Sequence, residues 1–297
     1  MTAQMIDGKM VAQKIHEETA KETRLLREKY NLQPGLAVVL IGEDTASQIY
    51  VNMKGKLSKE LGFYSDKIVL DKDVAMREVL HIVEKLNKDP RIHGILVQSP
   101  PPPQIDEEKV IEAIDYRKDV DCFNAINVGK MLIGKTDGFY PCTPYGVIKL
   151  LEYYNINPSG KHAVIIGRSN IVGKPLMALL VQKAMGADAT VTVCHSRTVD
   201  MKHYTTQADI LIAAIGKPEF VKADMVKSGA VVIDVGINRV KDDSSKTGYR
   251  LVGDVAFEEV SKKASFITPV PGGVGPMTIA MLMQNTIKAC KLQNGIK

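Results

Sequence analysis

Residues 162–184 read HAVIIGRSNIVGKPLMALLVQKA. An apolar strand runs into a turn that contains glycine and then into a helix, and this arrangement is typical of a site for a dinucleotide pyrophosphate. Gly167 and Gly173 allow a ligand to come close to the backbone, and Pro175 suits a first helical turn. The spacing is GRSxxxG instead of GxGxxG, so a tight turn that binds nothing remains the alternative.

The next strand indicates which dinucleotide is bound. In NAD enzymes this strand usually ends in Asp or Glu, which binds the ribose 2′-hydroxyl. Here ATVTVC, residues 189–194, is followed by His195, Ser196 and Arg197. An acid would repel a 2′-phosphate, whereas Arg168, Ser196 and Arg197 would bind one through charge-assisted hydrogen bonds. The sequence therefore predicts NADP, with solvated surface arginines as the alternative.

Strands and helices alternate on both sides of this segment, which predicts an α/β fold with parallel sheets covered by helices. In the first half we expect helices over 8–30, 47–61 and 75–87, and strands over 36–42, 67–70 and 93–98. In the second half we expect helices over 143–155 and 175–185, and strands over 162–166, 189–194, 209–215 and 230–235. Breakers near Pro141 predict two domains, 1–140 and a Rossmann-like domain 141–275, with a C-terminal helix within 276–297 that folds back onto the first.

Composition excludes several classes of protein. Of the 297 residues 45% are hydrophobic and 25% charged, as in ordinary globular chains, and no apolar run approaches the roughly 20 residues that span a bilayer. The N-terminus has no signal-peptide pattern, so we expect a cytoplasmic location. The 39 basic and 34 acidic residues are interspersed, which argues against a nucleic-acid surface. Four cysteines and six histidines are scattered, so we expect no disulfide and no metal site.

Candidate chemistry begins on the helix predicted over 47–61. Tyr50 and Lys54 are four residues apart and share a helix face, and partial burial would depress the pKa of Lys54 and make it a proton carrier. Gln98 ends a strand, where ligands of α/β sheets gather, and its amide would hold Lys54. Asp121 is one of two acids in the segment KDVD, and a carboxylate there can accept paired hydrogen bonds from a ligand. The alternatives are a solvated lysine, a glutamine that faces solvent and an aspartate that caps a turn.

Motifs spread over nearly the whole chain resemble those of the methylenetetrahydrofolate dehydrogenase/cyclohydrolase family. They are SQIYVNMKGK (47–56), ILVQ (95–98), KDVD (118–121), PCTP (141–144), IIGRSNIVGKP (165–175) and TPVPGGVGPMT (268–278). The resemblance implies two α/β domains flanking a cleft, with folate bound largely by the first and NADP by the second, usually in a homodimer. It implies oxidation of 5,10-methylenetetrahydrofolate by NADP and hydrolysis of the methenyl product to 10-formyltetrahydrofolate.

The resemblance also implies roles for single residues. Lys54 manages protons in the cyclohydrolase step with Gln98 as its partner, Tyr50 positions the folate, and Asp121 binds the pterin. The implied folate-binding residues are Tyr50, Lys54, Gln98, Asp121, Pro271, Gly272 and Gly273. The implied cofactor-binding residues are Gly167, Arg168, Ser169, Ile171, Gly173, His195, Ser196, Arg197, Ile237 and Thr278. Members of the family often carry glycine where Cys122 stands. From the residues alone, a plain hinge loop is the alternative for the glycine-rich segment that contains Gly272 and Gly273.

Three other functions remain as alternatives. A monofunctional relative would not need both Lys54 and the dinucleotide loop. A dinucleotide-sensing module would not need Tyr50, Lys54, Gln98 and Asp121 together. A dehydrogenase of small hydroxy acids would need a catalytic His or Lys near the second domain's cofactor, and the best candidate there is His195.

Overall fold

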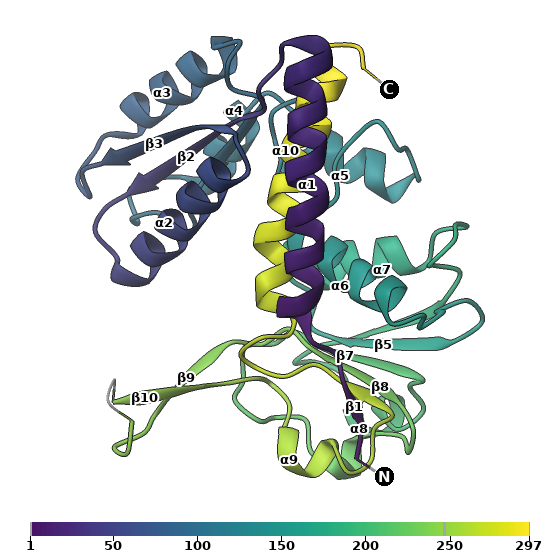
Figure 1. Ribbon diagram of the computed structural model, residues 1–297. Helices are drawn as coiled ribbons and strands as arrows, with labels where there is room; N and C mark the ends of the chain where they lie inside the picture. The colour runs from purple at the N-terminus through teal and green to yellow at the C-terminus, as the bar shows by residue number, and fades with distance from the viewer. Residues whose placement is uncertain (1, 246–247, 297) are drawn as a thin grey trace. The chain divides into compact units, whose positions relative to one another are not determined.

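The computed structural model describes residues 2–245 and 248–296, and it divides the chain into two units (Figure 1). The large-sheet unit comprises Met1–Gln13 and Thr143–Thr278, and the small-sheet unit comprises Lys14–Cys142 and Ile279–Lys297. Two helices, α1 (Gly8–Tyr30) and α10 (Val274–Gln293), each contribute residues to both units.

The large-sheet unit contains a six-stranded parallel sheet in the order β1-β11-β8-β7-β5-β6. Its strands are β1 (Gln4–Met5), β5 (His162–Ile166), β6 (Thr190–Cys194), β7 (Ile210–Ala213), β8 (Val231–Asp234) and β11 (Phe266–Ile267). Its helices are α6 (Cys142–Tyr153), α7 (Gly173–Leu180), α8 (Met201–Thr205), the 3₁₀ turn η1 (Ala223–Met225) and α9 (Phe257–Val260). Figure 1 shows α6 and α7 on one face of the sheet and α8 and α9 on the other. Because both faces are covered, β7 and β8 are buried throughout.

A separate two-stranded antiparallel hairpin belongs to the large-sheet unit. It consists of β9 (Asn238–Lys241) and β10 (Tyr249–Val252), and it forms a sheet of its own. The sequence analysis did not predict this hairpin, because its strands are short and interrupted by charged residues. Alternate side chains of β9 are exposed, as expected for a ribbon with one solvated face.

The small-sheet unit contains a three-stranded parallel sheet in the order β3-β2-β4. Its strands are β2 (Gly35–Ile41), β3 (Tyr64–Leu70) and β4 (Gly94–Val97), and its further helices are α2 (Thr45–Glu60), α3 (Met76–Lys88), α4 (Glu107–Ala113) and α5 (Ala125–Leu132). Figure 1 shows α2 and α3 on opposite faces of this sheet. The central strand β2 is buried at every residue, which explains its continuous apolar sequence.

Helices α1 and α10 lie side by side in the small-sheet unit (Figure 1). The Gln284 side-chain amide donates to the Thr19 hydroxyl at 2.6 Å, and Lys291 pairs with Glu22 at 3.0 Å. The C-terminal helix therefore packs on the unit that contains Lys14–Cys142, while Lys297 lies outside the described residues.

The predicted α/β class with two parallel sheets is confirmed. The predicted strand His162–Ile166 is reproduced, whereas the helix expected over 175–185 begins at Gly173 and ends at Leu180. Residues Met1–Gln13 group with the large-sheet unit although the sequence analysis assigned them to the first domain. The physical reason is β1, a two-residue strand that pairs with β11 and is too short to show a period in sequence.

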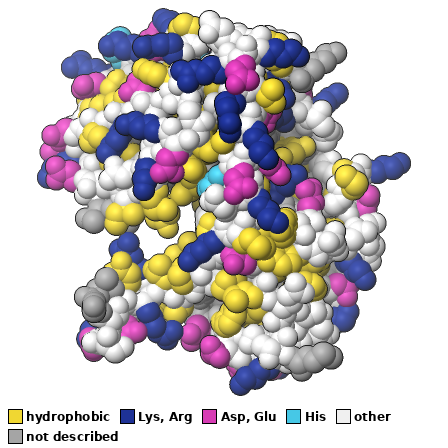
Figure 2. All heavy atoms as spheres, viewed as in Figure 1, with side chains coloured by type: hydrophobic (Ala, Val, Ile, Leu, Met, Phe, Trp, Pro, Cys, Tyr) yellow, Lys and Arg dark blue, Asp and Glu magenta, His cyan; other side chains and the backbone are white. Residues whose placement is uncertain are grey.

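The distribution of charged side chains and the hydropathy of the helices can be compared with what the composition predicts. Lys and Arg side chains are interspersed with Asp and Glu on the face shown in Figure 2, as they are along the chain. None of the helices within 2–245 and 248–296 is both long and apolar enough to cross a membrane.

Candidate functional site

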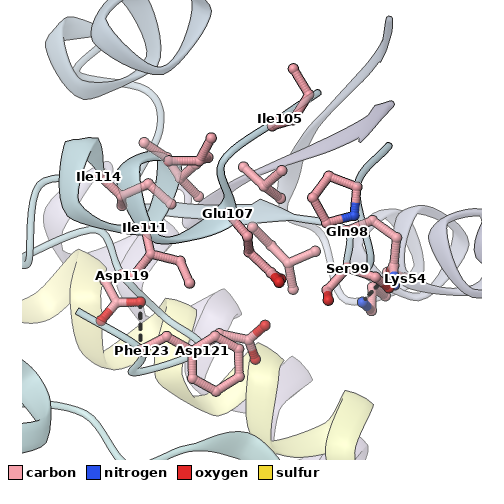
Figure 3. Close-up of a pocket in the computed structure, with 15 residues that line it drawn as sticks. Lys54, Gln98, Ser99, Ile105, Glu107, Ile111, Ile114, Asp119, Asp121 and Phe123 are labelled. Atoms are coloured by element: carbon pink, nitrogen blue, oxygen red, sulfur yellow. Dashed lines mark hydrogen bonds between the residues drawn. The ribbon is translucent and has the colours of Figure 1, made fainter. Parts of the chain in front are cut away.

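Lys54 lies on α2 and is largely buried, with 9% of its surface exposed. Its ammonium nitrogen donates a hydrogen bond to the side-chain oxygen of Gln98 at 3.0 Å (Figure 3). Burial lowers the pKa of Lys54, and the nearby Asp121 carboxylate opposes this effect. The lysine predicted as a proton carrier thus has a depressed pKa and a fixed partner.

Gln98 follows β4, whose carboxyl end places it opposite Lys54. Its amide nitrogen donates to the carbonyl oxygen of Ser99 at 2.8 Å. This bond assigns the amide orientation, so the other end of the amide presents an oxygen to the lysine. The expected partnership between Gln98 and Lys54 is therefore present.

The three charged residues of the segment KDVD have different environments. The Lys118 ammonium donates to the carbonyl oxygens of Leu86 and Asp89 at 3.0 and 2.8 Å, where it caps the end of α3. The Asp119 carboxylate accepts two backbone N–H groups, of residues 123 and 124, and one side-chain amide, of residue 127. These two residues build the turn, and Asp121 faces the pocket beside Lys54.

The pocket has a volume of about 100 Å³ and a polar and an apolar part (Figure 3). Its polar lining includes Lys54, Gln98, Ser99, Glu107 and Asp121. The apolar wall is formed by side chains of β4, of α4 and of the segments before and after α4, including Ile105, Val110, Ile111, Ile114 and Phe123. The structure thus brings three predicted residues, Lys54, Gln98 and Asp121, to one pocket of the small-sheet unit. Tyr50, one turn earlier on α2, is 43% exposed and does not line this pocket.

Cys122 occupies a left-handed backbone conformation, with φ of 61°. This backbone conformation favours glycine, which explains why members of the family that the sequence resembles often have glycine at this position. The Cys122 thiol is buried and donates to the carbonyl oxygen of Phe139 at 3.0 Å. Burial raises the pKa of the Cys122 thiol, so the thiol stays neutral and non-nucleophilic.

The predicted dinucleotide loop links β5 to α7. At Gly167, with φ of 127°, a Cβ atom would lie 2.1 Å from the carbonyl oxygen of Ala214. At Gly173 it would lie 2.2 Å from the carbonyl oxygen of Gly167. Both glycines are therefore required by the packing of the loop itself. The Ser169 hydroxyl accepts from the backbone N–H of Val172 at 3.1 Å and supports the start of α7.

Two arginines lie at the carboxyl ends of neighbouring strands. Arg168 follows β5 and Arg197 follows β6, and these strands pair in parallel. Both residues are exposed, and within 2–245 and 248–296 neither guanidinium group forms an ion pair. His195 orders the turn by accepting from the Arg197 backbone N–H at 3.1 Å, and Ser196 is exposed beside it. This edge offers uncompensated positive charge to an anion.

The remaining predicted residues also lie in the large-sheet unit. Ile171 and Ile237 have exposed side chains, and the Thr278 hydroxyl lies 2.8 Å from that of Thr143. Pro271, Gly272 and Gly273 form the turn before α10, and Gly272 has φ of 109°.

Lys9 was missed by the sequence analysis. Its backbone N–H donates to the Gly272 carbonyl oxygen at 3.1 Å, and its side chain packs beside Gly272. Nothing in the sequence distinguishes it from the other lysines of α1.

Two buried carboxylates of the large-sheet unit were also missed. Asp254 accepts from three consecutive backbone N–H groups, Ile215, Gly216 and Lys217, at 2.7, 3.0 and 2.8 Å. It also accepts from the side-chain amide of Asn238 at 2.9 Å. This carboxylate therefore holds the turn after β7 and the first residue of β9.

Asp234, the last residue of β8, completes the arrangement. It accepts from the backbone N–H groups of Gly236, Asp254 and Val255 at 3.0, 2.9 and 2.9 Å. Burial raises the pKa of Asp234 to about 7 even though these bonds oppose the shift. In sequence the only signal is an aspartate near a glycine in each of the segments DVG and GDV.

Comparison with known proteins assigns the family. The catalytic-domain profile of tetrahydrofolate dehydrogenase/cyclohydrolase matches residues 6–121, and the profile of its NAD(P)-binding domain matches residues 141–294. The chain belongs to this family. The sequence resemblance is thereby confirmed, and the second profile covers the predicted dinucleotide loop.

Relatives match over almost the full length. The chain is 54% identical to "Bifunctional protein FolD" of Chlorobium chlorochromatii (strain CaD3), covering 98% of this chain and 99% of the relative. Among solved structures, the bifunctional methylenetetrahydrofolate dehydrogenase/cyclohydrolase FolD of Campylobacter jejuni is 48% identical with a TM-score of 0.92, covering 98% and 99% of the two chains. The Trypanosoma brucei FolD, solved in complex with NADP and an inhibitor, is 39% identical with a TM-score of 0.93, covering 99% of each chain.

Proposed function

We propose that this chain oxidises 5,10-methylenetetrahydrofolate to the 5,10-methenyl compound with NADP and hydrolyses that product to 10-formyltetrahydrofolate. The observation that carries the proposal is the pocket in which Lys54, Gln98 and Asp121 meet in a chain of this family. A buried amine with a depressed pKa suits the hydrolysis, and the glycine-lined loop with its exposed arginines suits the oxidation.

The large-sheet unit supplies the residues for NADP. The close backbone packing at Gly167 and Gly173 leaves the turn and the start of α7 free of side chains at these positions, where a pyrophosphate can approach. Arg168, Ser196 and Arg197 would hold the 2′-phosphate. NADP held there would supply the hydride acceptor for the methylene carbon. The protein's part in this step is to orient the two reactants, because the folate nitrogens already stabilise the cationic product.

The small-sheet unit supplies the residues for hydrolysis. Water adds to the methenyl carbon and gives one proton to the neutral amine of Lys54, which Gln98 holds in place. The bond from this carbon to N5 then breaks. N5 takes up a proton, the new hydroxyl loses its proton as the formyl carbonyl forms, and one proton is released per turnover. Asp121 binds the amidine-like edge of the pterin, and the exposed ring of Tyr50 packs on the folate.

An absorbance assay tests the proposal. The purified chain is given 5,10-methylenetetrahydrofolate with NADP or with NAD, and formation of reduced nicotinamide is followed. A separate reaction follows the loss of added methenyltetrahydrofolate. We expect activity with NADP, weaker activity with NAD, and hydrolysis above the uncatalysed rate. Absence of either activity would contradict the bifunctional assignment.

We also propose that the chain forms a homodimer through the β9–β10 hairpin. The hairpin forms a sheet of its own and lines an open groove of about 780 Å³ with Arg250, Leu251 and Val252. An exposed strand ribbon beside a groove can pair with a second copy of the same surface. Light scattering on the parent chain and on a Leu251→Asp variant tests this, with a monomeric variant as the expected result.

The cytoplasmic location remains a prediction.

A further inference from the structure

We propose that Asn285 of α10 is a positioning residue for Asp121, and that its amide sets the affinity for the folate substrate. This inference rests on the proposed function, because it takes Asp121 as the group that binds the pterin. Both residues and the contacts between them lie within the small-sheet unit.

Asn285 is buried, with 2% of its surface exposed. Its side-chain nitrogen donates to the carbonyl oxygen of Val120 at 2.7 Å and to that of Tyr140 at 2.9 Å. An amide nitrogen carries two hydrogens, so both are used. Because Val120 directly precedes Asp121, one buried side chain ties the backbone of the acid to the segment before α6.

The same nitrogen lies 3.7 Å from the sulfur of Cys142. The Cys142 side chain lies near the Asp121 carboxylate, and its thiol donates to the Val120 carbonyl oxygen at 3.5 Å. Burial raises the pKa of Cys142, so its thiol stays neutral beside the carboxylate. Asn285 therefore supports Asp121 in two ways. It binds the backbone at Val120, directly before Asp121, and it lies beside Cys142, which is near the Asp121 carboxylate.

The loop is also held at other points. Cys122, directly after Asp121, is bound to the Phe139 carbonyl oxygen at 3.0 Å. On the other side Val120 packs so closely on β4 that a Cβ atom at Gly94 would lie 2.8 Å from its side chain. These contacts keep the loop folded when Asn285 is replaced, so the amide acts on the precise position of Asp121 more than on the existence of the loop.

The Asn285→Leu variant tests this role, because leucine has a similar volume and no donors. It leaves two buried carbonyl groups without their partner, and the loop relaxes toward other partners. We expect the KM for methylenetetrahydrofolate to rise by on the order of tenfold, the effect of losing about 1.4 kcal/mol. The same rise is expected for methenyltetrahydrofolate in the hydrolysis, while the KM for NADP and kcat stay close to the parent values.

Thr286→Val is the matched control. Thr286 is the next residue of α10, is fully buried, and donates only within its helix, to the Leu282 carbonyl oxygen at 2.8 Å. We expect this variant to lose stability in a thermal melt without a change in the KM for folate. A second variant, Asn285→Asp, keeps the shape but turns acceptors toward the two carbonyl groups, so its KM for folate should rise further. Asp121→Asn sets the scale, because it alters the pterin contact itself and should impair both activities.

The outcomes separate the inference from the proposed function. A parent chain with neither activity refutes the proposed function, and this inference with it. An active parent with an unchanged folate KM in Asn285→Leu overturns the inference alone. A rise in the KM for NADP as large as that for folate, or a change shared by Thr286→Val, overturns it too, because either would show a general loosening of the fold.

Discussion

Two groups of charged side chains, Asp254 with Asp234 in the large-sheet unit and Lys54 with Asp121 in the small-sheet unit, differ in how far their hydrogen-bonding capacity is used. In the large-sheet unit the Asp254 carboxylate receives four hydrogen bonds, and Asp234 receives three. In the small-sheet unit Lys54 donates one hydrogen bond, to Gln98, and lines an open pocket with Asp121. An ammonium group has three donors, so Lys54 retains capacity that a substrate or water can use.

This difference distinguishes structural residues from functional ones. A carboxylate whose oxygens accept several backbone N–H groups fixes the turns after β7 and β8, and it has little remaining capacity to accept hydrogen bonds from a ligand. A buried amine that is only partly bonded is held at a cost, and such groups concentrate at functional sites. Substitutions in the two groups should therefore affect different properties, stability for Asp254 and Asp234 and activity for Lys54 and Asp121.

The largest effect is expected for Lys54→Met. Cyclohydrolase activity should fall by about 10² to 10⁴, the usual contribution of a positioned proton carrier, while hydride transfer stays measurable. Stability should not fall, because methionine keeps most of the stem and removes a desolvated charge. The measurement is accumulation of methenyltetrahydrofolate by its near-ultraviolet absorbance, with a thermal melt on the same sample. Hydrolysis at the parental rate would show that the proton carrier lies elsewhere.

Asp254→Ala should show the opposite behaviour. Removing the acceptor of four buried donors should lower the free energy of unfolding by about 3 to 5 kcal/mol. Asp224→Ala is the control, because Asp224 is exposed and its ion pair with Lys202 at 2.7 Å should contribute little to stability. Urea unfolding of both variants provides the comparison. An equal loss of unfolding free energy in both variants would contradict the distinction between a buried carboxylate with four hydrogen bonds and a surface carboxylate.

Arg168→Ala tests the role of an exposed charged group, the Arg168 guanidinium, in NADP binding. Loss of an arginine–phosphate contact should weaken NADP binding by about 1.5 to 3 kcal/mol and leave NAD binding nearly unchanged. Stability should stay at the parental value, since the guanidinium is exposed. Titration of both cofactors by intrinsic fluorescence or calorimetry measures this. An equal loss for both would place the 2′-phosphate away from Arg168.

Sequence reasoning succeeded where a residue's role is local or repeated along the chain. The continuous apolar run of β2 and the turn from β5 to α7 follow from burial and from backbone sterics, which a short stretch of sequence records. For Lys54 and Gln98, the helix face and the strand end gave the two positions, and the family resemblance identified the residues as partners. Those positions follow from secondary structure alone.

Sequence reasoning failed where a contact joins distant segments and neither local structure nor the family resemblance indicates it. Asp254 meets residues 215–217, and Asn285 meets Val120 and Tyr140, across separations of more than thirty residues. Neither residue belongs to a periodic pattern that would show its partner. The strand β1 was missed because two residues cannot display an alternation. Such features depend on tertiary packing, which a single sequence does not encode in any local signal.

The smallest effect is expected for Asp234. It concerns the pH dependence of stability, and it tests whether three hydrogen bonds from backbone N–H groups are enough to keep a buried carboxylate ionised. Its pKa in the folded chain is raised to about 7, whereas an unfolded aspartate has a pKa near 3.9. Between these values the folded state binds one more proton than the unfolded state, so the stability from this group declines as pH rises. That contribution is fully present below about pH 4 and is lost above about pH 7.

The Asp234→Asn variant isolates this contribution, because an amide does not titrate in this range and its oxygen can still accept two of the three backbone bonds. The difference in unfolding free energy between parent and variant should shrink by about 2 kcal/mol from pH 5.5 to 7.5, most steeply below about pH 6.5, where the slope approaches about 1.4 kcal/mol per pH unit. Carboxylates whose pKa values are lowered, such as Asp209 and Asp224, titrate below this range and leave the difference unchanged. Urea unfolding of both proteins across this range gives the measurement. A constant difference would mean that Asp234 is ionised throughout, and that its three N–H donors offset burial completely.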